Sequence, residues 1–239
     1  MTATGVIATD PISPDHLNAS QPGTDLAGTD LASTAPTPET ATAAGAVRWA
    51  VETFGPDLTL LCSGQDAVLI DVALKVDPTI EVAFIDTGFH FNETIETVLR
   101  IAERYRPRLR VVVPWRHLPG ASKPGFCCSE HKVEQLEVAL AGKQAWLSGL
   151  RWADGPERAG TTMVELDRRG LAKINPLVAW SDDEVAAYEQ ANDIIVNPLR
   201  DSGYPSIGCR PCTSPIEPGA DARAGRWAGQ DRTECGIHW

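Results

Sequence analysis

The sequence predicts an α/β protein built around a doubly wound, mostly parallel β-sheet. Short apolar runs of strand length alternate with longer segments whose apolar residues recur at helical spacing. Each apolar run ends in a short polar loop that leads into the next helical segment. A repeated order of strand, loop and helix requires parallel pairing of the strands. With 43% hydrophobic residues, the 239-residue chain can bury a sizeable core.

The expected elements follow one another from residue 39. A first helix ends at Gly55-Pro56, since proline cannot continue it. A capping box, Ser181-Asp182-Asp183-Glu184, starts the last helix, which ends near residue 192. On the helix over 92–105, the apolar pattern predicts that Ile95, Val98, Ala102 and Tyr105 face inward. The strands are expected over 58–62, 80–85, 109–113 and 145–148, with further helices after residues 66 and 129.

The two ends of the chain differ in composition from its middle. Residues 1–38 contain few large apolar side chains, so burial cannot offset the entropy of ordering them. Beyond Asn197-Pro198, glycine and proline dominate up to the C-terminus. We therefore expect a disordered N-terminal extension over 1–38, an α/β nucleotide-binding and cluster domain over 39–212, and a mobile C-terminal catalytic tail over 213–239.

Charge and hydropathy exclude several classes of function. The net charge of −11 argues against a nucleic-acid surface, because phosphate contacts need clustered lysine and arginine. No apolar run approaches the ~18 residues needed to cross a bilayer. The N-terminus lacks the basic and apolar regions of a signal peptide. The sequence thus predicts a cytoplasmic protein with no nucleic-acid or membrane partner.

Four of the six cysteines form two close pairs, Cys127-Cys128 and Cys209-x-x-Cys212. Two such pairs are the pattern of a four-thiolate site. Two disulfides would need an oxidising compartment, which nothing in the sequence suggests. Structural zinc sites usually separate the ligands of both pairs by two to four residues, whereas neighbouring cysteines can bind different irons of one cube. The pattern favours a [4Fe-4S] cluster, with zinc as the next alternative.

Polar loops follow two successive predicted strands. One is Ser63-Gly64-Gln65-Asp66 and the other is Asp86-Thr87-Gly88. Doubly wound sheets bind ligands beyond the carboxyl ends of their strands, often on helix N-termini. Either loop alone is weak evidence, but the two together indicate a nucleotide pocket. The alternative is that both are tight turns without a ligand.

Four further residues bear on the chemistry. Lys132 lies in the first turns of a helix, where a cation is unfavourable against the positive end of the dipole, so it either meets an anion or is solvated. Cys235 has no neighbouring cysteine and is either a reactive thiol or an idle terminal one, with His238 as a candidate proton or charge partner. Cys62 ends an apolar strand and is expected to be buried and inert.

Taken together, these motifs resemble the sulfonucleotide reductase family, in particular the bacterial iron–sulfur adenosine 5′-phosphosulfate (APS) reductases. The resemblance covers about residues 42 to 238. It also rests on Arg223-x-x-Arg226-Trp227 and on Glu234-Cys235-Gly236-Ile237-His238, a motif highly specific to the family. It implies an adenine-nucleotide α-hydrolase-like fold. Because all four cluster cysteines are present, it implies APS as the substrate instead of the 3′-phosphorylated nucleotide, PAPS.

The resemblance also implies a role for each motif. Cys235 would attack the sulfur of APS, expel AMP and carry a thiosulfonate, from which reduced thioredoxin would release sulfite. The ligands of the [4Fe-4S] cluster would be Cys127, Cys128, Cys209 and Cys212. The implied substrate-binding residues are Ser63, Gly64, Asp66, Asp86, Thr87, Gly88, Lys132, Arg151, Arg223, Arg226 and His238.

One position departs from the family pattern. Members usually carry two adjacent arginines where this chain has Arg151-Trp152. The phosphate contact is therefore expected to rest on Arg151 alone or to move to Arg158. Losing one charge-assisted contact would raise the dissociation constant of the substrate by about tenfold.

Alternatives to an APS reductase come from three classes. A PAPS reductase shares most of the motifs. A PP-loop tRNA-thiolation enzyme shares the nucleotide loop but would need a basic surface, which the net charge of −11 contradicts. A non-enzymatic iron–sulfur sensor would need a DNA-reading or dimerising module, and the sequence shows none.

Overall fold

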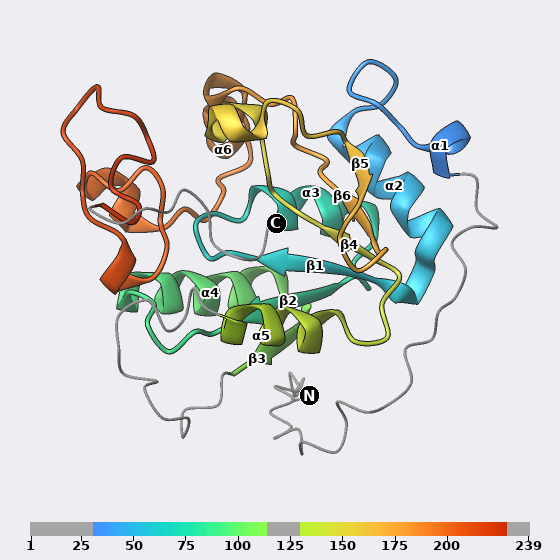
Figure 1. The fold of residues 1–239 in the computed structure, drawn as a ribbon, viewed down its shortest axis with the longest axis horizontal. Helices are drawn as coiled ribbons and strands as arrows, with labels where there is room; N and C mark the ends of the chain where they lie inside the picture. The colour runs from blue at the N-terminus through green and yellow to red at the C-terminus, as the bar shows by residue number, and fades with distance from the viewer. Residues whose placement is uncertain (1–30, 114–129, 229–239) are drawn as a thin grey trace.

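The computed structural model describes residues 31–113 and 130–228, which form a six-stranded sheet in the order β3-β2-β1-β4-β6-β5. Figure 1 shows this sheet at the centre of the molecule. Neighbouring strands in it pair in parallel, except for the antiparallel pair β5–β6. This confirms the predicted α/β class and mostly parallel sheet. The strands are β1 (Leu58–Cys62), β2 (Glu81–Ile85), β3 (Arg108–Val112), β4 (Ala145–Leu147), β5 (Val164–Leu166) and β6 (Ala172–Ile174).

The winding of the sheet reverses between β1 and β4. From β1 the chain proceeds to β2 and β3 at one edge, and then returns to place β4 on the other side of β1. The loops that leave the carboxyl ends of β1 and β4 therefore diverge. In doubly wound sheets this reversal point is where ligands bind. The topology alone thus directs attention to the residues after Cys62 and after Leu147.

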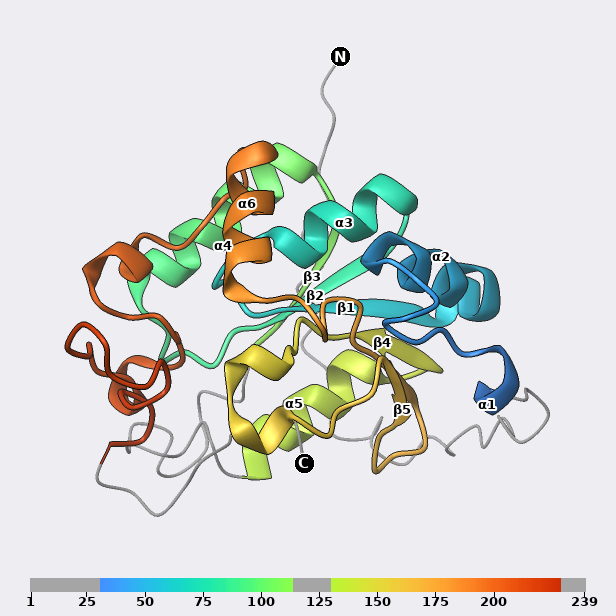
Figure 2. The ribbon, with the colours of Figure 1, turned by 90° about the horizontal axis from the view of Figure 1, so that it is seen from above.

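Helices cover both faces of the sheet. Figure 2 shows α5 on one side and α2, α3 and α4 on the other. The two hydrophobic clusters match this division, since α2 and α3 share a core with β1, whereas α5 packs against Trp146, Ala83 and Val112. The helices are α1 (Leu31–Thr34), α2 (Ala43–Phe54), α3 (Val68–Val76), α4 (Asn92–Tyr105), α5 (Glu130–Leu140) and α6 (Asp182–Ala191).

Local capping explains where these helices begin and end. Helix α2 stops at Gly55, whose φ of 50° lies in the left-handed region. The predicted capping box of α6 is present, with Ser181 Oγ accepting from Glu184 N at 3.2 Å and Ser181 N donating to Glu184 Oε2 at 2.8 Å. The predicted bounds of α4 are confirmed as well.

The buried face of α4 differs from the prediction. Besides Val98 and Ile101, its buried residues are Thr94 and Thr97, whereas Ile95, Ala102 and Tyr105 are only partly buried. The threonine hydroxyls are satisfied, because Thr97 Oγ1 donates to Glu93 O at 2.7 Å and Thr94 Oγ1 accepts from Asn197 Nδ2 at 3.1 Å. A hydrogen-bonded hydroxyl can be buried at little cost. The apolar pattern alone therefore shifted the predicted inward face by about one residue from the observed one.

The hairpin β5–β6 was not predicted. Each strand has only three residues, which is too short for a periodic pattern. The turn between them is closed by Asp167, whose main-chain N donates to Leu171 O at 2.9 Å, with Gly170 at a φ of 77°. This hairpin supplies the antiparallel edge of an otherwise parallel sheet.

Some residues on either side of the predicted α/β domain belong to the described structure. Within the predicted extension, residues 1–30 lie outside the described residues, but 31–34 form α1 and Leu31 packs against the main core. Within the predicted tail, residues up to 228 are described, and Trp227 is only 2% exposed. Over the ranges 31–113 and 130–228, no helix is long and apolar enough to cross a membrane.

Candidate active site

A cavity of about 580 Å³ lies at the carboxyl ends of β1 and β4, where the winding of the sheet reverses. The β1 loop (residues 63–66) and the β4 loop (residues 148–158) both contribute to its wall. The rest of the wall includes apolar residues of β1, β2 and α3, residues of α4 and α6, and the segment after residue 199. Its arginines are Arg151, Arg158, Arg200, Arg223 and Arg226. An apolar floor below several guanidinium groups suits a ligand with a ring at one end and anionic groups at the other.

The shape of the β1 loop depends on Gly64 and Asn197. Gly64 has a φ of +72°, and a Cβ there would lie 2.8 Å from Thr94 Cγ2. Only glycine fits such a position. The buried Asn197 donates from Nδ2 to Gly64 O at 3.1 Å and from its main-chain N to Gln65 O at 3.0 Å. The loop is thus held by uncharged hydrogen bonds from a segment that is distant in the sequence.

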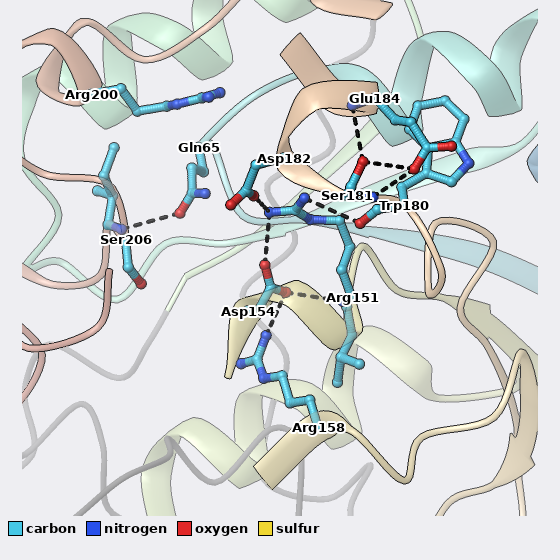
Figure 3. Close-up of polar contacts among 12 residues, drawn as sticks. Gln65, Arg151, Asp154, Arg158, Trp180, Ser181, Asp182, Glu184, Arg200 and Ser206 are labelled. Carbon is cyan, nitrogen blue, oxygen red and sulfur yellow. Dashed lines mark hydrogen bonds and ion pairs between the residues drawn. The ribbon is translucent and has the colours of Figure 1, made fainter. Parts of the chain in front are cut away.

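Ser63, Gln65 and Asp66 of the β1 loop all line the cavity, and Ser63 is exposed. Gln65 Oε1 accepts from Ile207 N at 3.1 Å, which joins the loop to the segment after residue 199 (Figure 3). Asp66 Oδ1 accepts from Val68 N at 3.0 Å at the start of α3. Burial raises the pKa of the Asp66 carboxyl.

The second predicted loop, residues 86–88, meets the cysteine turn (residues 209–212). Asp86 Oδ1 accepts from Gly88 N at 2.8 Å, which closes the loop, and Thr87 Oγ1 lies 3.2 Å from Cys209 Sγ. Ile85 and His90, on either side of the loop, line the cavity. The structure therefore brings the predicted nucleotide loop together with the predicted cluster ligand.

Both thiols of the cysteine turn are buried, with Cys209 4% and Cys212 3% exposed. Cys212 N donates to Cys209 O at 2.9 Å in a short 3-10 turn, and Trp227 N donates to Cys212 O at 2.9 Å. Within the described chain, the buried indole Nε1 of Trp227 has no hydrogen-bond partner. A sulfur-rich group beside the two cysteines would offer that missing acceptor, so these residues fit a cluster.

The other two predicted cluster ligands, Cys127 and Cys128, lie outside the described residues, as do Cys235 and His238. Lys132 belongs to α5, but its side chain is likewise outside the description. Over the described ranges, no three His, Cys, Asp or Glu side chains are grouped to hold a metal ion. A four-ligand site at the cysteine turn would therefore need ligands from the rest of the chain.

The β4 loop is organised by charged side chains (Figure 3). Arg151 Nη2 donates to Asp154 Oδ1 at 3.0 Å and to Asp182 Oδ1 at 2.9 Å, while Nη1 donates to Trp180 O at 3.4 Å. Arg158 Nη1 donates to the other oxygen of Asp154 at 2.8 Å. Arg151, predicted to bind substrate, therefore donates several of its hydrogen bonds to protein groups.

Trp152, at the position where the resemblance led us to expect a second arginine, does not line the cavity. Its indole Nε1 donates to Thr161 O at 2.7 Å, and the residue is 38% exposed. Its side chain thus makes a structural contact.

Arg223 and Arg226 reach the same cavity from the C-terminal segment. Arg226 Nη1 donates to Ser206 Oγ at 3.1 Å, and its Cζ lies 4.4 Å from the centre of the Trp227 ring. A Cβ at Gly208 would lie 2.5 Å from Arg226 Nη2, so glycine gives the guanidinium its space. Arg223 Nε lies 3.4 Å from Glu157 Oε1 of the β4 loop. The predicted pair of cations is thus placed beside the cysteine turn.

Cys62 lies in the cavity wall at the end of β1. Burial raises the pKa of its thiol to about 12, so it stays protonated at neutral pH. A protonated thiol is a poor nucleophile, in agreement with the expected inert role.

Sequence reasoning missed the residues that hold the site together. Asn197 was visible only as the start of a proline-rich segment, although an Asn-Pro pair after a helix does signal a turn. Asp154 and Asp182 pair with Arg151 across the fold, and no local pattern reveals such a contact. Arg200, which lines the cavity and pairs with Glu189, had no motif to mark it.

Comparison with known proteins shows similarity to reductases of APS and PAPS. Residues 57–215 match the model of the phosphoadenosine phosphosulfate reductase domain. An adenosine 5′-phosphosulfate reductase of Mycolicibacterium smegmatis is 46% identical over 83% of this chain and 89% of its own length. One of Mycobacteroides abscessus is 44% identical over 83% of this chain and 88% of its own. A crystal structure of a phosphoadenylyl-sulfate (PAPS) reductase from Candida auris aligns with a TM-score of 0.63 and 26% identity, over 87% of this chain and 100% of that one.

Proposed function

Because the chain belongs to the phosphoadenosine phosphosulfate reductase domain family, we propose that it reduces APS to sulfite and AMP in sulfate assimilation, with thioredoxin as electron donor. One observation carries the choice of site. A single cavity wall joins Ser63 of the β1 loop, the cations Arg223 and Arg226, and Cys209 of the cysteine turn. Thioredoxin is kept reduced in the cytoplasm, which is where this reaction would take place.

Binding of APS uses both ends of the cavity in this proposal. The adenosine lies against the apolar floor near the β1 loop, at the reversal point of the sheet. The phosphosulfate lies toward Arg158, Arg223 and Arg226, with Lys132 and His238 as further contacts. Each hydrogen bond between a guanidinium and an anionic oxygen contributes about 1.5–3 kcal/mol.

The proposed chemistry is two successive nucleophilic displacements at sulfur, each by a thiolate. The thiolate of Cys235 attacks the sulfur of APS, the bond from that sulfur to the phosphate oxygen breaks, and AMP leaves with the electron pair. A thiol of thioredoxin then attacks Cys235 Sγ and expels sulfite, leaving a mixed disulfide. The second thioredoxin thiol resolves this disulfide and regenerates Cys235. Both electrons therefore come from thioredoxin.

A [4Fe-4S] cluster is the cofactor we propose for the cysteine turn. Cys209 and Cys212 would bind it together with Cys127 and Cys128. When bound, it would tie two distant segments of the chain into one unit beside the cavity. The buried thiols, Thr87 next to Cys209 and the indole of Trp227 are the residues that support this assignment.

A side-by-side assay tests the proposed function. Anaerobically purified protein is given APS or PAPS with reduced thioredoxin, and sulfite release is measured. We expect APS to be used with a kcat/KM at least about a hundredfold above that for PAPS. A preference for PAPS would replace the APS assignment by the related PAPS reductase. The absence of sulfite from either nucleotide would overturn the proposal.

A further inference from the structure

Asp154 accepts hydrogen bonds from two arginines of the β4 loop. Its Oδ1 accepts from Arg151 Nη2 at 3.0 Å, and its Oδ2 accepts from Arg158 Nη1 at 2.8 Å. Oδ2 also accepts from the main-chain N of Arg151 at 3.0 Å. One carboxylate therefore binds the guanidinium groups of Arg151 and Arg158 and the main chain at Arg151 (Figure 3).

Arg158 is placed by this contact more strictly than an exposed arginine would be. The residue is only 9% exposed, although it lines the cavity. A buried guanidinium needs a charged partner to offset the loss of hydration. The bond from Arg158 Nη1 to Asp154 Oδ2 restrains where the guanidinium lies in the cavity wall.

Asp182 provides an internal comparison, because it binds only one of the two arginines. Its side chain is 79% exposed, against 21% for Asp154, and its Oδ1 accepts from Arg151 Nη2. The two aspartates thus accept from the same nitrogen of Arg151, and of the two Asp154 also accepts from Arg158.

We propose that Asp154 is a positioning residue for the substrate phosphate, acting through Arg158. The carboxylate of Asp154 binds Arg151 through one oxygen and Arg158 through the other, and so sets the spacing between two arginines that both line the cavity. This role rests on the proposed function, since the phosphate in question is that of APS or of its product AMP.

The first test is Asp154→Asn in the holoenzyme, measured by APS turnover and by calorimetric binding of AMP. The substitution keeps the size of the side chain but places an amide against one of the guanidinium groups. We expect KM for APS and Kd for AMP to rise about tenfold, the cost of one misplaced charge-assisted contact, with kcat changed less than about twofold. Asp193→Asn is the control, since Asp193 forms an exposed pair with Arg104 and does not line the cavity; it should change both constants less than about twofold.

Two further variants separate positioning from a structural or a purely electrostatic role. Asp154→Glu keeps the charge but lengthens the side chain, so KM should stay raised; a return to the wild-type KM would contradict a fixed spacing. In an Arg158→Ala background, Asp154→Asn should add no further increase in KM. An additional tenfold increase there, or a fall in kcat with KM unchanged in Asp154→Asn, would overturn the proposal.

The same measurements distinguish this inference from the proposed function. If the wild-type enzyme binds AMP and releases sulfite from APS while Asp154→Asn shows unchanged KM and Kd, only the role of Asp154 is wrong. If the wild-type enzyme neither binds AMP nor uses APS, the proposed function is wrong and the role of Asp154 falls with it.

Discussion

The β1 and β4 loops face each other across one cavity, yet they are stabilised by different forces. The β1 loop is held by the amide and main chain of Asn197, all uncharged groups. The β4 loop is held by Asp154 and Asp182 on Arg151. Uncharged hydrogen bonds between buried groups are little affected by salt, whereas pairs of partly exposed charges are screened. Salt should therefore leave the stabilisation of the β1 loop unchanged and weaken that of the β4 loop.

Removing Asn197 should have the largest effect on stability. Asn197→Ala leaves Gly64 O, Thr94 Oγ1 and Leu199 N without their side-chain partner in a buried site. We expect the free energy of unfolding to fall by about 3 kcal/mol, at about 1 kcal/mol for each of these three unsatisfied groups. Urea unfolding of the wild type and the variant at low and high salt measures this loss in the free energy of unfolding. The loss should be the same at both salt concentrations, and a loss that shrinks with salt would contradict the uncharged character of this loop.

Removing Arg151 should have an intermediate effect that salt reduces. Arg151→Ala deprives Asp154 and Asp182 of a shared cation. We expect a loss of about 1.5–2 kcal/mol at low ionic strength, typical of hydrogen bonds to charged groups. The same urea unfolding experiment at about 0.5 M salt should show a smaller loss. An equal loss at both salt concentrations would remove the contrast between the two loops.

The smallest expected effect comes from Asp66, a charged group inside the otherwise uncharged β1 loop. Burial raises the pKa of its carboxyl, so its contribution to stability is fully present below the ordinary aspartate pKa and is lost as pH rises through the raised value. Asp66→Asn keeps an acceptor for Val68 N without the buried charge. Near pH 7 the variant should therefore melt higher, by on the order of one or two degrees.

The control for this prediction is the pH profile itself. Below the ordinary pKa of aspartate, where the carboxyl of Asp66 is neutral in both states, the wild type and Asp66→Asn should melt together. A gain in Tm that persists unchanged into that acidic range would mean that burial of the charge is not its cause.

The fold was largely predictable from local patterns. β1 and α4 have the predicted bounds, because each is an apolar run or a periodic segment closed by clear end signals. The hairpin β5–β6 was not predictable, since strands of three residues are formed by pairing with a partner and not by their own pattern. The buried Thr94 and Thr97 were missed for a related reason, because their hydrogen-bond partners decide whether they can be buried.

The candidate site was predictable where it is built from contiguous motifs. The β1 loop and the cysteine turn were identified by their own residues and spacing, and the pair Arg223 and Arg226 by the family resemblance. The structure places them around one cavity or against its wall. Asp154 and Asn197 were not identified, because each acts by reaching a residue that only the fold brings near. Local sequence therefore marked the groups that would touch a ligand, whereas the groups that hold them depend on tertiary contacts.

The central claim is tested most directly by the fate of Cys235. When enzyme is mixed with APS in the absence of thioredoxin, we predict one stoichiometric release of AMP. The protein should then gain the mass of one SO3 group on the peptide that contains Cys235, and reduced thioredoxin should remove that mass as sulfite. Cys62→Ser should form the adduct normally, because the protonated thiol of Cys62 is not a nucleophile. An adduct on another cysteine, or turnover that survives in Cys235→Ser, would contradict the account.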